Sequence, residues 1–324
     1  MHKKALRPSF QQEKSAGNPS VMPSERFRTS RNDKLTTKYS AYGQTLKSTL
    51  NRFYKEYDFQ KRLLHDPIEL PHRYRNPRDI EIAGFLASSF AYGKVGLFKP
   101  VVEKVLSCMG KSPHDFLMHF SVARHVRLFN GIQYRFNRNE DILCLLFMLR
   151  AVLKKEGSLE GSFMKHYQDE DENIGSALSG MITELLSVNT AKVYGRDIRP
   201  AGLVQFFPSP VGGSTCKRQN LFLRWMVRDR DIDFGIWKRI PKNKLVIPLD
   251  THIMKISQCL GFTKRKSADW KTAVEITESL KRFDPEDPLK YDFALCHYGI
   301  SGLCKGVSGD GCRGCAFGDH RTTY

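Results

Sequence analysis

The chain has 324 residues and a mass of 37.2 kDa, and 52 Lys and Arg against 34 Asp and Glu give it a formal charge of +18. This length predicts one large core or two smaller ones, and the charge attracts polyanions in a salt-dependent way. A hydrophobic content of 40% excludes wholesale disorder, and no apolar run is long enough for a membrane-spanning helix. We expect a monomeric protein of the cytoplasm, associated with the nucleoid if the source is bacterial, and without a membrane partner.

Residues 1–40 differ from the rest of the chain in composition. They hold nine Lys and Arg against three Asp and Glu and show no hydrophobic period. We expect a flexible basic tail, with a phosphate-contacting arm as the alternative. Residues 41–324 are predicted as one helical domain, with a hairpin and aspartate region at 208–303 and a cysteine-rich loop at 304–320.

The region before residue 208 carries the apolar spacing of amphipathic helices. Apolar residues recur at intervals of three and four from Leu46 and from Ile80, and Asp79 is a candidate N-cap for the second of these helices. The segment Ile142–Leu153 is apolar nearly all round, which is typical of a buried helix. Strand alternation and a strand–glycine loop–helix unit are missing, which counts against a nucleotide-binding α/β fold. The sequence predicts a mainly α-helical protein.

A stretch rich in proline and glycine, Pro208–Arg218, predicts a tight turn that leads into a helix. Ser214 or Thr215 can cap this helix. The free N–H groups at a helix start can bind a phosphate, and neighbouring basic side chains add positive charge there. The residues predicted to form this phosphate-binding turn are Gly212, Gly213, Ser214 and Arg218, with Lys217 beside them.

The apolar run Leu245–Leu249 ends at Asp250, where another helix begins, since Ile253 and Ile256 keep helical spacing. One interpretation is that Asp250 only caps this helix. The other is that its carboxylate faces a substrate. The two interpretations are compatible, because a capping carboxylate can leave its second oxygen free.

Cysteines gather near the end of the chain, as Cys304, Cys312 and Cys315 with a spacing of x7 and x2. Thiolates at this spacing suit a [4Fe–4S] cluster or zinc, and Cys296 or His320 could supply a fourth ligand. The alternative is a set of unpaired reduced thiols.

The segment Pro248–Ile253 resembles the one that bears the catalytic aspartate in the helix-hairpin-helix DNA glycosylases, the superfamily of endonuclease III and the 8-oxoguanine glycosylases. The likeness continues through Asp292–Gly299 and ends in the cysteine cluster, where endonuclease III-like enzymes hold an iron–sulfur cluster. Ile80–Phe90 resembles the superfamily's early helix more loosely. The chain also resembles a related, uncharacterised bacterial family that shares a stretch like Lys217–Val227. The resemblance covers roughly residues 45–320.

Two features depart from the superfamily's usual pattern. The hairpin usually reads Leu-Pro-Gly-Val-Gly, whereas Ser209–Gly213 has an altered order, and endonuclease III-like enzymes finish their cluster with a fourth cysteine that this chain lacks. Lys217 and Asp250 are separated by 33 positions, which is longer than in endonuclease III and resembles the archaeal 8-oxoguanine glycosylase branch.

The resemblance implies two helical subdomains with a cleft between them and a base-excision repair glycosylase that acts on damaged duplex DNA. It implies Asp250 as the catalytic carboxylate that stabilises a cation-like sugar, and a neutral Lys217 amine that attacks C1′ and forms a Schiff base for AP-lyase cleavage. The phosphate-binding turn then becomes a DNA contact. The alternatives are a catalytically inactive nucleic-acid-binding protein of the same fold and a partner-binding protein with a basic surface.

Overall fold

The computed structural model describes residues 45–304 and 315–320. Within these ranges the backbone is mainly helical, and the only β-type pairing is an isolated bridge between Tyr134 and Asn137. The prediction of a mainly α-helical protein is confirmed. The expected basic tail, residues 1–40, lies outside the described residues. Across the described ranges, no helix combines the length and apolar character that crossing a membrane requires.

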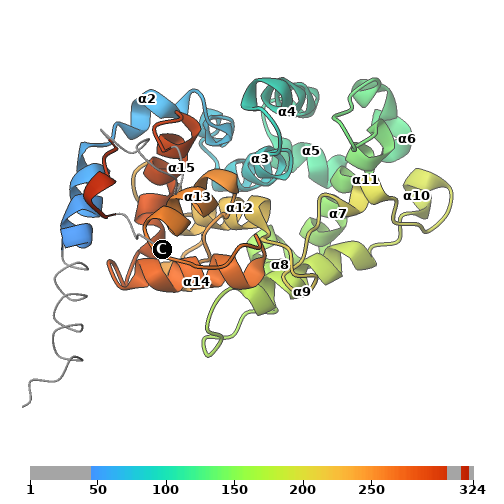
Figure 1. Ribbon diagram of the computed structural model, residues 1–324. Coiled ribbons are helices and arrows are strands. Elements are labelled where there is room, and N and C mark those ends of the chain that lie inside the picture. Colours follow the sequence, from blue (N-terminus) through green and yellow to red (C-terminus); the bar gives the residue numbers. More distant parts are fainter. Residues whose placement is uncertain (1–44, 305–314, 321–324) are drawn as a thin grey trace, which may run out of the picture. The chain divides into compact units, whose positions relative to one another are not determined.

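Figure 1 shows the helices in chain order, coloured from blue to red. After a helical stretch at residues 45–56, the α-helices are α2 (Phe59–Leu63), α3 (Pro77–Ser89), α4 (Val95–Met109), α5 (Pro113–His119), α6 (Val122–His125), α7 (Asn139–Glu156), α8 (Leu159–Met164), α9 (Gly175–Ser187), α10 (Ala191–Tyr194), α11 (Ala201–Val204), α12 (Lys217–Val227), α13 (Thr251–Cys259), α14 (Trp270–Lys281) and α15 (Asp292–Ile300). The 3₁₀ helices are η1 (Pro67–Glu69), η2 (Pro71–Arg73), η3 (Val126–Phe129), η4 (Lys242–Lys244), η5 (Pro288–Tyr291) and η7 (Gly318–His320).

Helices α3 and α12 pack against each other and are both buried along most of their length. Gly84 of α3 allows the close approach, because a Cβ at this position would lie 3.0 Å from the Met226 Cε. Phe85 and Phe222 meet edge to face across the same contact, with ring centroids 5.3 Å apart. This packing holds the start of α12, and therefore Lys217, in a fixed place.

The start of α3 differs from the sequence prediction. Asn76 is the N-cap, and its side-chain oxygen accepts a hydrogen bond from the Arg78 N–H. Asp79 lies inside the helix and accepts hydrogen bonds from the Ser112 hydroxyl and the His114 N–H, at 2.8 and 2.9 Å. Asp79 therefore secures the start of α5, a distant partner that local spacing does not reveal.

Glu81 also lies on α3, is buried, and caps the start of a distant helix, α8. Its carboxylate accepts hydrogen bonds from the Leu159 and Glu160 N–H groups, which begin α8, and from the Trp237 indole at 2.9 Å. Trp237 belongs to the connection at 229–244, which has no α-helix and whose only regular element is η4. The tryptophan of this charged connection is therefore part of the core.

Helix α7 confirms the prediction of a buried helix, with ten buried residues among its eighteen. Helix α11 is short and ends at Val204. Phe206 and Phe207 follow in a turn and are buried.

The buried segment Leu245–Leu249 runs between α12 and α14 and leads directly to Asp250. The Ile247 N–H donates to the Thr277 hydroxyl at 3.0 Å, and the Ile247 carbonyl accepts a long hydrogen bond from the Asn220 side chain. Helix α13 then packs on α15, where Gly299 faces the Cβ of His252. These contacts fix the start of α13 relative to α12 and α15.

Candidate functional site

The structure brings Lys217 and Asp250 together, although they are far apart in sequence. Lys217 is the first residue of α12, and Asp250 is the N-cap of α13. The Lys217 Nζ lies 3.5 Å from the Asp250 Oδ2, and the two side chains remain 35% and 14% exposed. An amine and a carboxylate therefore meet where solvent can reach both of them.

Asp250 divides its two carboxylate oxygens between two roles. Its Oδ1 accepts hydrogen bonds from the His252 and Ile253 N–H groups, both at 2.9 Å. These two hydrogen bonds to one oxygen hold the side chain in one orientation. The Oδ2 is left to face Lys217, so capping and chemistry are compatible at this residue.

Cys296 of α15 is a third member of this cluster. Its thiol donates to the Asp250 Oδ2, with a sulfur–oxygen distance of 3.7 Å. Burial raises the pKa of Cys296 well above its usual value, and the nearby carboxylates of Asp250 and Asp292 raise it further. The thiol therefore stays protonated and acts as a weak hydrogen-bond donor to the oxygen that faces Lys217.

Cys296 lies beside Asp250, and its predicted role as a ligand together with the terminal cysteines stays a prediction. Among the residues that the structure describes, no three His, Cys, Asp or Glu side chains could together hold a metal ion. Cys315 accepts a hydrogen bond from the Tyr298 hydroxyl at 3.4 Å, and His320 lies 2.8 Å from the Thr49 hydroxyl. Cys312 lies outside the described residues. The described ligands do not form an iron–sulfur or zinc site by themselves.

The predicted phosphate-binding turn is formed by residues 210–213. Gly212 and Gly213 are exposed, and Gly213 has a left-handed φ of +74°, which glycine adopts without strain. Their N–H groups, however, donate to the carbonyls of Ser209 and Pro210 within the turn. The glycine amides are thus used internally, which argues against the phosphate contact predicted for them.

Ser214 is half-buried and does not cap α12 directly. Its hydroxyl accepts a hydrogen bond from the Cys216 N–H at 3.2 Å, and Cys216 is the N-cap, with a left-handed φ of +48°. Within residues 45–304 and 315–320, the backbone N–H groups at positions 217–219 have no protein acceptor. The donors that a phosphate could use lie at the start of α12, a few positions after the glycines.

Arg218 is buried, so its predicted role as a DNA contact is wrong. Its guanidinium donates to the carbonyls of Ser89 and Gln205, and it lies over the Tyr92 ring at 5.2 Å from the centroid. Burial lowers its pKa to about 10. Arg218 instead ties the start of α12 to the end of α3. The sequence alone does not distinguish a basic residue that contacts DNA beside a turn from one that is buried and links two helices.

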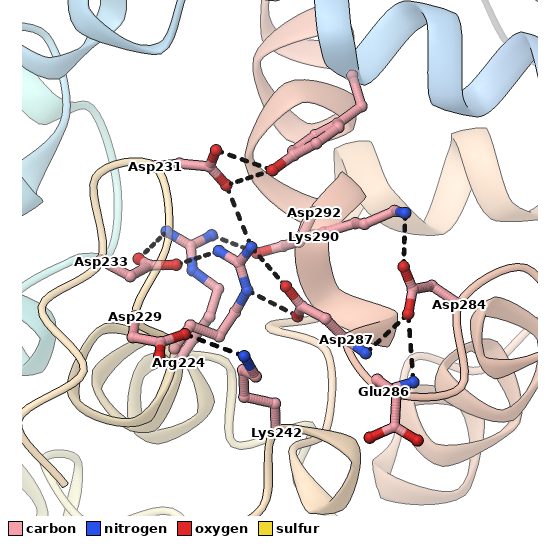
Figure 2. Close-up of polar contacts among 12 residues, drawn as sticks. Arg224, Asp229, Asp231, Asp233, Lys242, Asp284, Glu286, Asp287, Lys290 and Asp292 are labelled. Atoms are coloured by element: carbon pink, nitrogen blue, oxygen red, sulfur yellow. Dashed lines mark hydrogen bonds and ion pairs between the residues drawn. The ribbon is translucent and has the colours of Figure 1, made fainter. Parts of the chain in front are cut away.

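Sequence reasoning missed a buried ion-pair network behind the site, which Figure 2 shows. Arg224 of α12 and Arg228, the C-cap of the same helix, are only 2% exposed. Their partners are the carboxylates of Asp231, Asp233, Asp287 and Asp292, and the Tyr54 hydroxyl donates to Asp231. The signal in the sequence is two arginines spaced by four among apolar residues, followed at once by alternating aspartates.

Asp292 links this network to the Lys217–Asp250 pair. It accepts from Arg224 at 2.5 Å and lies one helical turn before Cys296 on α15. Burial raises the pKa of Asp292 to about 6, although Arg224 acts in the opposite direction, and the Asp250 carboxylate raises it further. Asp292 therefore belongs to the ion-pair network and also lies on the same helix as Cys296, whose thiol contacts Asp250.

Residues 66–301, which are well over half of the chain, match the family described as "Protein of unknown function (DUF2400)". No curated protein and no solved structure matches the chain significantly. The matched range contains Lys217, Asp250, Cys296 and the whole buried ion-pair network, and the chain belongs to this DUF2400 family.

Proposed function

We propose that the protein is a base-excision DNA glycosylase with a helix-hairpin-helix arrangement, in which α11, the turn at 210–213 and α12 form the hairpin unit. The observation that carries the proposal is the contact between Lys217 and Asp250 at two helix starts. This pairing of an amine with a carboxylate is the one that base removal with a covalent intermediate needs. The proposal also includes two helical subdomains with the substrate between them.

Asp250 is suited to stabilise the positive charge that develops on the sugar when the bond between C1′ and the base breaks. A carboxylate acts best when it is already oriented before the reaction begins. The two N–H groups on Oδ1 and the thiol of Cys296 on Oδ2 supply this orientation. The cap that holds α13 thus also prepares the carboxylate.

Lys217 is placed to attack C1′ from beside the same carboxylate. In this step the Nζ–C1′ bond forms while the bond to the base breaks, and the departing base takes up a proton. Opening of the sugar ring gives the Schiff base, and loss of a proton from C2′ then expels the 3′ phosphate, which is the AP-lyase reaction. Because only a neutral amine attacks, Lys217 must first lose a proton. The Asp250 Oδ2, 3.5 Å away, can accept this proton and pass it to the departing base, which leaves the carboxylate charged as the cation-like sugar develops.

The net charge of +18 fits a DNA partner, because such an excess of cations binds a phosphate backbone with release of counterions. The target nucleotide must leave the base stack before Lys217 and Asp250 can reach its sugar, at a cost of about a few kcal/mol. Contacts to the flanking phosphates offset this cost. The N–H groups at the start of α12 are one source of such contacts.

A second candidate function is a catalytically inactive nucleic-acid-binding protein. It is favoured by the fact that Asp250 already caps α13 and pairs with Lys217, which explains both residues without chemistry. A panel of duplexes, each with one oxidised, deaminated, alkylated or abasic site, separates the two functions. We expect base release or strand cleavage on at least one duplex, whereas salt-sensitive binding with no reaction on any duplex would support the inactive protein.

A further inference from the structure

A surface hollow of about 820 Å³ is lined by residues at the start of α7, on α10 and on α11. Neither Lys217 nor Asp250 is among its lining residues. We call it the Phe136 hollow. Its lining combines one exposed aromatic ring with charged residues of both signs. The lining residues on which the inference rests are Arg135, Phe136, Arg138, Glu140, Asp141 and Gln205.

Phe136 is 65% exposed, which is high for a phenylalanine in a folded chain. The ring lies nearly parallel to the Tyr92 ring, at an interplanar angle of 15° and with the ring centroids 6.5 Å apart. The Arg135 guanidinium carbon lies 5.8 Å from the Phe136 centroid and 5.9 Å from that of Tyr92. The hollow therefore presents a flat apolar face whose orientation is already set.

The backbone of this loop is fixed as well. The N–H and carbonyl groups of Tyr134 and Asn137 bond to each other in both directions, at 2.9 and 2.8 Å, and Arg135 between them has a left-handed φ of +49°. The Tyr134 hydroxyl donates to the Tyr92 carbonyl, and the Tyr92 hydroxyl donates to the Asn137 side chain. A ligand that stacks on Phe136 would thus lose little entropy from ordering the loop.

The charged residues around the ring favour a nucleotide over an apolar ligand. Arg135 and Arg138 are exposed and can meet a phosphate. Both oxygens of Asp141 are occupied, by the Arg138 N–H and the Tyr194 hydroxyl. Glu140 is exposed and makes no hydrogen bond or ion pair to any described residue. A free carboxylate would repel phosphate but can accept hydrogen bonds from the N–H groups on the edge of a base.

The hollow is connected to α12 by a chain of hydrogen bonds. The Asn137 amide donates to the Gly202 carbonyl and to the Gln205 Oε1. The same Gln205 oxygen accepts from the Arg218 guanidinium at 3.2 Å. Arg218 follows Lys217 on α12, so the loop that carries Phe136 and the start of α12 form one rigid unit.

We propose that the Phe136 hollow binds an unpaired nucleotide of a nucleic-acid strand, with its base stacked on Phe136 and its phosphates beside Arg135 and Arg138. This interaction surface extends the proposed function. The choice of DNA as the strand that binds rests on that proposed function. Stacking of bases on aromatic rings is tolerant of sequence and is the usual way in which proteins hold single-stranded segments. The surface would therefore contribute affinity for locally unpaired DNA, independently of any reaction at Lys217.

Variants of the full-length chain test this inference through binding, measured by fluorescence anisotropy at low salt. The probes are a labelled duplex with a central unpaired nucleotide, the fully paired duplex and a free mononucleotide. We expect Phe136→Ala to weaken binding of the unpaired-nucleotide duplex about tenfold and to change binding of the paired duplex little. Leu64→Ala is the matched control, because Leu64 is equally exposed at 67% but lies outside the hollow. This control should bind as the wild type does.

Phe136→Trp keeps a stacking ring and adds a fluorescent reporter. Its emission should be quenched by the duplex with the unpaired nucleotide, and its affinity should match that of the wild type. Unchanged binding by Phe136→Ala, the absence of quenching, or a mononucleotide that binds as tightly as the strand would overturn the inference. Quenching by this duplex, together with no reaction on any duplex of the lesion panel, would overturn the proposed glycosylase while leaving this surface intact, so the two failures are distinguishable.

Discussion

Replacement of Asp250 by asparagine should slow base release from a damaged duplex by about 10² to 10³-fold, the usual loss when one oriented group that stabilises transition-state charge is removed. Asparagine keeps an oxygen that can accept from the His252 and Ile253 N–H groups, so α13 stays capped. It removes the negative charge beside Lys217. Single-turnover assays on the duplex that the wild type processes best would measure the loss.

Asp269→Asn is the matched control for this variant. Asp269 is also the N-cap of an α-helix, and its carboxylate accepts from the Thr272 N–H at 2.8 Å at the start of α14. The same change in the same structural role should leave base release unaltered. Equal rates for Asp250→Asn and the wild type, with both proteins folded, would show that Asp250 only caps its helix.

Replacement of Arg228 by methionine should lower the free energy of unfolding by about 3–5 kcal/mol, because removal of one partner leaves buried charge uncompensated. Both carboxylate oxygens of Asp287 are bonded to the Arg228 side chain, at 2.8 and 2.9 Å. Asp233 loses one of its two arginine partners, and its carboxylate is fully buried. Urea denaturation followed by circular dichroism would measure the difference.

The control for this variant is Arg73→Met, which breaks ion pairs at the surface. Arg73 contacts Glu69 and Glu103, and its side chain is 46% exposed. Surface pairs of this kind contribute about 0–1 kcal/mol. If both variants lower the free energy of unfolding by the same amount, the buried network stabilises the fold no more than surface ion pairs do. The interpretation that the network in Figure 2 supports the site would then fail.

Local patterns in the sequence predict several of the longer helices, among them α3, α7 and α13, and the role of Asp250 as an N-cap. Apolar spacing depends on residues within one or two turns of each other, and capping depends on a single residue at a helix start. The buried character of α7 follows from its composition alone. These features are decided within the segment that carries them, so they can be read without knowledge of the fold.

Contacts between distant segments could not be read in this way. The sequence around Arg218 predicts a DNA contact, whereas its guanidinium donates to the carbonyls of Ser89 and Gln205. Nothing in the sequence around Cys296 indicates its contact with Asp250. The same reason explains why Asp79 caps α5 and not its own helix. Only the resemblance to the DNA glycosylases linked Lys217 with Asp250, because nothing in the local pattern of either helix start points to the other.

The turn at 210–213 shows a further limit of sequence reasoning. Two adjacent glycines suggest open backbone amides, yet both amides close the turn in which they lie. Whether a glycine N–H faces a ligand depends on the dihedral angles around it, and these are set by packing against α14, where the Trp270 N–H donates to the Gly213 carbonyl.

The most direct test of the Lys217–Asp250 pair is chemical trapping of the covalent intermediate. The full-length protein would be incubated with a duplex that contains an abasic site in the presence of borohydride, which reduces a Schiff base to a stable amine, and the adduct would be mapped by peptide mass spectrometry. We expect a single adduct on Lys217 and none in Lys217→Gln. An adduct on a different lysine, or an undiminished yield from Lys217→Gln, would contradict the proposed role of this amine.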